Sequence, residues 1–229
     1  MPRRKIINKK AENEESQKAK EENEENKKSN LSWIAIAILI LAVVFIVFYY
    51  VFQDWGIVKY QGLKFTMEKY GKDLIVYHYE YYFKGPDNQV YKNNVYLRHD
   101  PRKNSAPVNG EIVFSNVQPV YISVNSEQLK SCEDSVIAVA TLSQFLAHNL
   151  FNVKGATPNE KEATERNVTF VNCTTYPEHT TILLQAGEKT SITKEKNCYI
   201  VNVSNCEIQQ AVERFIVQAL IDAKKRYSS

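Results

Sequence analysis

Glycine is scarce in this chain, with seven Gly among 229 residues. This scarcity argues against glycine-rich phosphate-binding loops and against collagen-like or linker-rich architectures. The sequence also lacks a GxSxG nucleophile motif, an HExxH zinc motif and an EF-hand series. No motif therefore points to an enzymatic reaction, and we expect neither a cofactor nor a bound metal.

Most of the chain has no excess of positive or negative charge. The first thirty residues contain nine Lys or Arg and seven Glu, and the remainder contains twenty Lys or Arg and nineteen Asp or Glu. Such a near-neutral body offers no basic surface for a phosphate backbone, so we expect no nucleic-acid partner. Residues 1–30 mix Lys, Glu and Asn with almost no apolar side chains, which predicts a disordered cytoplasmic tail.

One segment has no charge at all. From Leu31 to Phe52 the chain reads LSWIAIAILILAVVFIVFYYVF. As an α-helix this segment would be about 33 Å long, enough to cross a hydrocarbon core of about 30 Å. Trp33 near one end and Tyr49, Tyr50 and Trp55 near the other suit the two headgroup zones. The sequence therefore predicts a transmembrane helix over 31–52, with the lipid bilayer as its partner.

A cleaved signal peptide is the alternative interpretation of this segment. Signal peptides have an apolar region of about 7–15 residues, followed by small residues at the cleavage site. Here the apolar run is longer, and it ends in FYYVFQDWG, with bulky aromatic side chains where small ones are needed. We expect the segment to remain as an anchor.

Two independent patterns predict the orientation of this anchor. Lys27 and Lys28 precede the apolar segment, whereas the first cation after it is Lys59, which favours a cytoplasmic N-terminus. None of the cysteines lies in the tail or the span, and all follow it, as an oxidising exterior permits: Cys132, Cys173, Cys198 and Cys206. We predict a single-pass cell-membrane protein whose C-terminal body is extracytoplasmic and stapled by disulfides.

The spacing of the cysteines limits their pairing. A predicted strand would hold Cys198 and Cys206 about 25 Å apart, whereas the Cα atoms of a disulfide lie within about 7 Å of each other. Two connectivities remain: Cys132–Cys206 with Cys173–Cys198, which the similar helix-start settings of Cys132 and Cys206 favour, or Cys132–Cys198 with Cys173–Cys206. Acidic neighbours argue against reactive thiolates, and the wide spacings argue against zinc.

Residues 57–109 have the pattern of a β-rich juxtamembrane unit. In LIVYHYEYYF, alternate residues fall on one face of a strand: Ile75, Tyr77, Tyr79, Tyr81 and Phe83. The turn-forming residues 85–89 and a second strand over 90–97 predict a hairpin. A tyrosine-rich face can stack on sugars or on a protein, but we favour packing against the rest of the fold.

Residues 110–226 alternate between strand and helix patterns. We expect strands at 111–116 and 119–124, a helix capped by Ser131, and a last helix over about 206–226 with Ser204 and Glu207 as its capping box. The predicted apolar stripe of the first helix is Val136, Val139, Ala140, Leu142, Leu146 and Leu150. The predicted buried face of the last helix is Ile208, Ala211, Val212, Phe215, Ala219 and Leu220. The predicted fold class is α+β or α/β, with helices packed on a mixed sheet.

Function is the least determined property of the sequence. We expect a non-catalytic binding or assembly module of the cell envelope, with a protein or glycan partner. The alternative is an extracytoplasmic enzyme with its site in the loop Asn125–Asp134, which contains Glu133 and Asp134 at a strand end. Asn167, at a strand entrance, is the most accessible of three N-glycosylation sequons.

Overall fold

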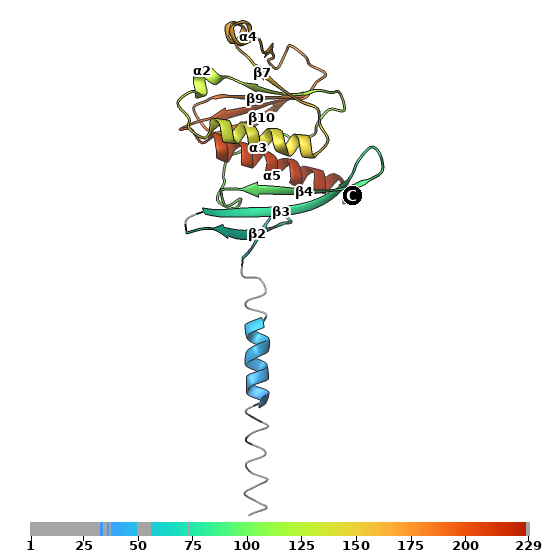
Figure 1. The fold of residues 1–229 in the computed structure, drawn as a ribbon, viewed down its shortest axis with the longest axis vertical. Helices are drawn as coiled ribbons and strands as arrows, with labels where there is room; N and C mark the ends of the chain where they lie inside the picture. The colour runs from blue at the N-terminus through green and yellow to red at the C-terminus, as the bar shows by residue number, and fades with distance from the viewer. Residues whose placement is uncertain (1–32, 34–35, 37, 50–55, 73, 228–229) are drawn as a thin grey trace, which may run out of the picture. The chain divides into compact units, whose positions relative to one another are not determined.

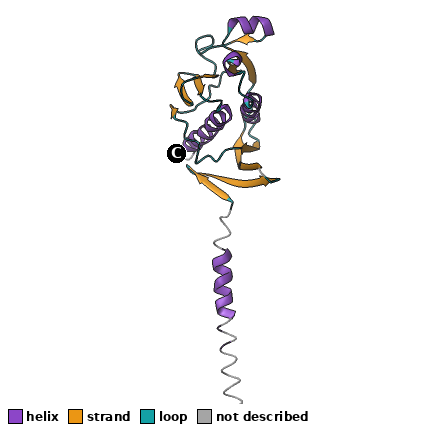
Figure 2. Ribbon diagram, turned by 90° about the vertical axis from the view of Figure 1, so that its left-hand side faces the viewer, coloured by secondary structure: helices purple, strands orange, loops and turns teal. Residues whose placement is uncertain are grey.

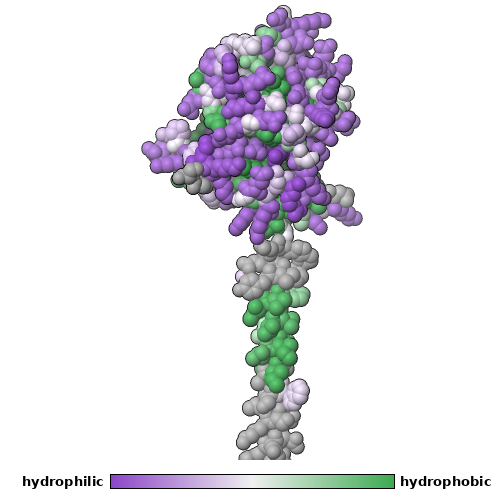
Figure 3. All heavy atoms as spheres, turned by 180° about the vertical axis from the view of Figure 1, so that it is seen from behind, coloured by the Kyte–Doolittle hydropathy of each residue, from purple (hydrophilic) through white to green (hydrophobic). Residues whose placement is uncertain are grey.

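The computed structural model describes residues 33, 36, 38–49, 56–72 and 74–227. The chain divides into two compact units, Met1–Trp55 and Gly56–Ser229. In the first unit, residues 38–49 form a helix with exposed and almost entirely apolar side chains (Figure 3).

The predicted anchor, Leu31–Phe52, lies within this first unit. Within the described ranges, no helix is both long enough and apolar enough to cross a bilayer. The tail over residues 1–30 and part of the segment Leu31–Phe52 lie outside the described residues, so both stay predictions.

The second unit begins with a four-stranded antiparallel sheet. Its strands lie in chain order and are β1 (Ile57–Tyr60), β2 (Leu63–Tyr70), β3 (Leu74–Lys84) and β4 (Val90–Leu97). The predicted hairpin is confirmed, because β3 pairs with β4 and the Gly85 amide donates to the Gln89 carbonyl at 2.9 Å across the turn. The predicted tyrosine face of β3 points inward, and Tyr77, Tyr79 and Tyr81 pack against the hydrophobic core.

A seven-stranded mixed sheet forms the opposite side of the unit. Its order is β5-β10-β11-β9-β6-β7-β8. Strands β6, β7, β8, β9 and β11 are parallel, whereas β10 and β5 run the other way. The bounds are β5 (Val108–Asn109), β6 (Val120–Val124), β7 (Val153–Thr157), β8 (Thr169–Phe170), β9 (Thr181–Ala186), β10 (Ser191–Glu195) and β11 (Cys198–Val203).

Helices fill the space between the two sheets and cover one end of the larger one. They are α2 (Ser126–Leu129), α3 (Ser135–His148), α4 (Glu160–Arg166) and α5 (Ile208–Tyr227). Figures 1 and 2 show α3 and α5 between the sheets, and the two helices contact each other. The mixed α+β architecture with helices packed on a mixed sheet confirms the coarse fold prediction.

Helix α5 is buried on two faces because a sheet packs on each side of it. The predicted apolar face, which includes Val212 and Phe215, is buried, and so are Val217 and Ile221 on the opposite face. Three polar side chains of α5 are buried as well: Gln209, Glu213 and Asp222.

The strand predicted over residues 111–116 does not form. The amides of this segment donate to side chains instead of to a neighbouring strand: Ile112 to the Asp222 carboxylate at 2.9 Å and Val113 to the Tyr199 hydroxyl at 2.6 Å. Since these backbone groups are already paired, the segment can bury Ile112 without joining a sheet.

The predicted start of α3 is also wrong. The helix begins at Ser135, with Asp134 at the N-cap position and no side-chain cap bond. Asn125 instead caps the short helix α2, where its side chain accepts from the Gln128 amide. With this later start, Val136 is exposed, and Ala138 and Phe145 take buried positions that the predicted stripe did not include.

Candidate functional site: a polar groove beside His99

Two disulfides staple the second unit. Cys132 pairs with Cys206 across 74 residues of chain, and Cys173 pairs with Cys198 across 25. The prediction of disulfide bonds is confirmed, and the pairing is the favoured one of the two left open. No free cysteine occurs among the described residues. The first bond joins the loop before α3 to the loop before α5, and the second holds the segment after β8 against the start of β11.

The remaining residues singled out from sequence lie apart from one another. The loop Asn125–Asp134 follows the carboxyl end of β6, as expected, but Glu133 is exposed there. Asp134 lies 3.8 Å from Arg98 in a surface ion pair. Asn167 is exposed at the C-cap of α4, with the left-handed φ of 50° that ends this helix. The structure brings none of these residues into a common site.

A polar groove of about 540 Å³ opens beyond the carboxyl ends of β9 and β11. Ligands of sheets with parallel strands commonly bind outside these strand ends. Three segments far apart in the chain form its walls: residues 99–107 after β4, residues 188–190 after β9, and residues 204–210 at the entry to α5. The groove is therefore formed by loops that follow strands of the two sheets.

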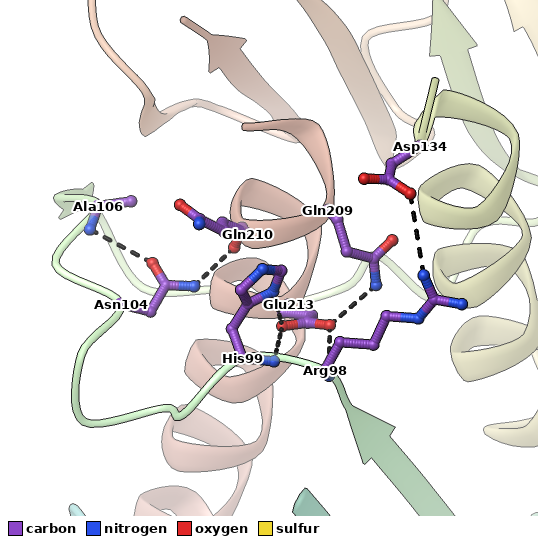
Figure 4. A network of polar contacts seen from close by, with 8 residues as sticks. All are labelled: Arg98, His99, Asn104, Ala106, Asp134, Gln209, Gln210 and Glu213. Atoms are coloured by element: carbon purple, nitrogen blue, oxygen red, sulfur yellow. Dashed lines mark hydrogen bonds and ion pairs between the residues drawn. The ribbon is translucent and has the colours of Figure 1, made fainter. Parts of the chain in front are cut away.

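His99 lines this groove and is held from behind by Glu213 of α5 (Figure 4). The imidazole donates from Nδ1 to Oε2 of Glu213 at 2.9 Å. The carboxylate also accepts from the amides of Arg98 at 2.8 Å and His99 at 3.1 Å, and from Nε2 of Gln209 at 2.8 Å. Glu213 is only 1% exposed. Such a fully bonded carboxylate fixes the position of the ring.

The environment of His99 favours its charged form. The hydrogen bond to Glu213 raises the pKa of His99 above its ordinary value of 6.5, while partial burial acts in the opposite direction. The negative charges of Glu213 and Asp134 add to the increase, and Arg98 opposes it. With Nδ1 engaged, Nε2 is the remaining donor, and among the described residues it has no protein partner.

Other charges around the groove are partly neutralised. Asp100 accepts from the Arg102 guanidinium at 2.6 Å, which lowers the pKa of this aspartate. Glu207 accepts from the Thr190 hydroxyl at 2.5 Å, so it does not form the predicted capping box. Lys103, Lys189 and Glu188 are exposed at the rim.

The turn between β11 and α5 has an unusual backbone. Asn205 and Cys206 both adopt left-handed conformations, with φ of 50° and 59°. Such conformations are uncommon outside glycine and persist where the surrounding structure holds them. Here the disulfide to Cys132 provides that restraint, and the turn forms one wall of the groove.

The arrangement suits recognition of an acidic group. A protonated imidazole held by a buried carboxylate can donate a charge-assisted hydrogen bond from Nε2. Within the described part of the chain, no cluster of three potential metal ligands occurs, and no hydroxyl or thiol is hydrogen-bonded to Nε2.

Sequence reasoning missed His99 and Glu213 because they are 114 residues apart. Glu213 is also a charged residue within an amphipathic helix pattern, and such a residue is expected on the solvent-exposed side. The chain matches no protein-family model, no curated protein sequence and no solved structure. Its function is therefore inferred from the geometry of the groove.

Proposed function

We propose that the unit Gly56–Ser229 is a non-catalytic binding module of the cell envelope. The segment Leu31–Phe52 anchors it in the cell membrane, with the N-terminus in the cytoplasm and the folded unit outside. Its groove holds an acidic segment of an envelope protein. The observation that supports this proposal is the imidazole of His99, held by Glu213 and open at Nε2 to a polar groove.

The charge of the groove argues for an acidic ligand. Protonated His99 and the two rim lysines, Lys103 and Lys189, offer three positive charges. Asp100 is neutralised by Arg102, which leaves the exposed Glu188 and the hydroxyl-bonded Glu207 as two negative charges of the lining. A carboxylate entering the groove would therefore meet more available donors than competing anions. Complementary charge of this kind contributes mainly to specificity and to the rate of association.

The proposal can be tested with a phage-displayed library of random dodecapeptides, selected at pH 6 on the full chain in detergent micelles. We expect the enriched peptides to contain Asp or Glu. Their affinity should fall about tenfold for His99→Ala, because one charge-assisted hydrogen bond is lost. It should also fall for the wild-type chain at pH 8, where more of the imidazole is neutral.

Two further variants control for folding and for the loss of a histidine. His99→Gln can still donate to Glu213 but cannot carry charge, so it should bind as weakly as His99→Ala while folding normally. His148→Ala removes an exposed histidine of α3 outside the groove and should bind as the wild type does. Equal affinity of His99→Ala and wild type, or enrichment of neutral sugars on a parallel glycan array, would contradict the proposal.

An extracytoplasmic enzyme is the second candidate. One observation favours it: a histidine oriented by a carboxylate is the usual arrangement of a general base. The binding module ranks first because no described nucleophile is hydrogen-bonded to His99. The double variant Glu133→Ala, Asp134→Ala removes the two carboxylates of the loop first considered for an enzyme. If this variant binds the selected peptides as the wild type does, these carboxylates take no part in binding at the groove.

A further inference from the structure

The four-stranded sheet has an outer face turned away from the hydrophobic core. Residues opposite one another in the register share a face, so Thr66, His78 and Tyr96 lie together across β2, β3 and β4. His78 stacks on Tyr96 with ring centroids 4.6 Å apart, and it bonds to Glu68 and Asn94 at 2.9 Å each. Phe65 and Leu97 belong to the other face and are fully buried.

The outer face exposes an unusual number of aromatic rings. Tyr70, Tyr82 and Tyr96 are 53%, 61% and 48% exposed, and Leu74 and Val90 add exposed apolar side chains. Each of these residues lies on the outer face by its register. Tyrosine rings with an apolar body and a polar tip suit the boundary between water and lipid.

The acidic residues of this face are already engaged. The Tyr70 hydroxyl donates to Glu68 at 2.6 Å, and this bond lowers the pKa of the glutamate. Lys92 lies 2.6 Å from Glu80 and likewise lowers the pKa of that glutamate. Both carboxylates therefore stay charged and hydrogen-bonded, but only the charge of Glu80 is neutralised by a cation, Lys92.

Lysines give the face a positive balance. Lys59, Lys64 and Lys84 are exposed on it in addition to Lys92, against Glu68 and Glu80. Each lysine near an anionic lipid surface contributes about 1 kcal/mol to attraction. The face thus combines cations, tyrosines and exposed apolar side chains on one side of a sheet.

The length of chain before β1 restricts what this face can meet. If the anchor ends at Phe52, only residues 53–56 remain before Ile57. Four residues reach no more than about 14 Å, and the headgroup zone itself extends several ångströms from the hydrocarbon core. The sheet therefore starts close to the bilayer surface.

We propose that the outer face of the four-stranded sheet lies on the headgroups of an anionic lipid bilayer. The tyrosines enter the interface, and the lysines meet lipid phosphates. This inference rests on the proposed membrane anchor, and it assigns the sheet a lipid surface in place of a protein or glycan partner.

Fluorescence quenching in nanodiscs tests the inference with the full chain. All four cysteines are paired, so Thr66→Cys introduces one reactive thiol on the outer face, and Glu165→Cys introduces one on α4 as a matched control. Each variant is labelled with a bimane fluorophore and inserted into nanodiscs with headgroup-nitroxide lipids. The discs contain phosphatidylcholine alone or mixed with phosphatidylglycerol.

We expect quenching of the label at position 66 and none at position 165. Quenching at position 66 should increase about twofold with phosphatidylglycerol and lose this increase in a Lys64→Glu, Lys84→Glu background. A chain that does not co-elute with the discs overturns the anchor and this inference together. Co-elution with an unquenched label at position 66 overturns the inference alone, and equal quenching in both lipid compositions overturns the role of anionic headgroups.

Discussion

Nδ1 of His99 lies 2.9 Å from the Glu213 carboxylate, although 114 residues of chain separate the two. The loop after β4 is thereby attached to the central helix α5. Through this contact the buried carboxylate of Glu213 raises the pKa of His99 in the groove.

The pKa of His99 should fall when Glu213 becomes Gln. The neutral amide removes the negative charge that raises the pKa of the imidazole. Titration of His99 by two-dimensional NMR of the ring protons measures this change directly. An unchanged pKa in the variant would show that Glu213 does not control the histidine.

Glu213→Ala should lower the free energy of unfolding by roughly 2–3 kcal/mol. The truncation leaves the amides of Arg98 and His99, and the amide group of Gln209, without their common acceptor. Urea unfolding monitored by circular dichroism gives the value. Glu165→Ala, at an exposed position of α4, is the control and should stay within about 0.5 kcal/mol of wild type.

Stability should depend on the charge of His99. A pKa raised in the folded state means that the contribution is fully present below about 6.5 and is lost as pH rises through the folded-state value. We expect the stability difference between wild type and His99→Gln to be largest at acidic pH and to shrink above neutrality. A stability difference that grows with pH would contradict a raised pKa of His99 beside Glu213.

The two disulfides should contribute unequally. Cys132–Cys206 closes 74 residues and Cys173–Cys198 closes 25, so the loop-entropy model makes the first worth about 1 kcal/mol more. Paired Cys→Ala variants of each bond, compared by urea unfolding, measure the difference. Intact mass after alkylation should show no free thiol before reduction and four after it.

Tyr199 should ionise unusually late. Burial raises its pKa to about 12, above the ordinary 10, so its contribution to stability is present below pH 10 and lost toward pH 12. Absorbance near 295 nm follows the ionisation of tyrosines. Compared with wild type, Tyr199→Phe should lose one tyrosine from the group that ionises well above pH 10. The variant also loses both hydroxyl bonds to the Val113 backbone, which should cost about 1–3 kcal/mol.

Local patterns made part of this fold predictable. The alternation in β3 and the turn at 85–89 specified a hairpin, and the period of α5 identified one of its buried faces. The second buried face was not predictable, because it depends on the four-stranded sheet packing on the far side of the helix. The charged Glu213 belongs to that face, where a solvent-exposed stripe would ordinarily be expected.

The segment 111–116 shows the same dependence on distant residues. Its apolar run Ile112–Phe114 indicates a strand. The amides of Ile112 and Val113 bond instead to Asp222 and Tyr199, which follow them by about a hundred residues. The groove has the same origin, since its walls come from three separate stretches of chain. Local sequence cannot specify such a meeting of distant segments.

The bond between Cys132 and Cys206 has a consequence for how a ligand would bind. It ties the turn that forms one wall of the groove to the start of α3, and Glu213 fixes the histidine at another wall. We expect a groove held in this way to keep one shape whether it is empty or filled. Little ordering then accompanies recognition, so a partner can dock nearly as a rigid body.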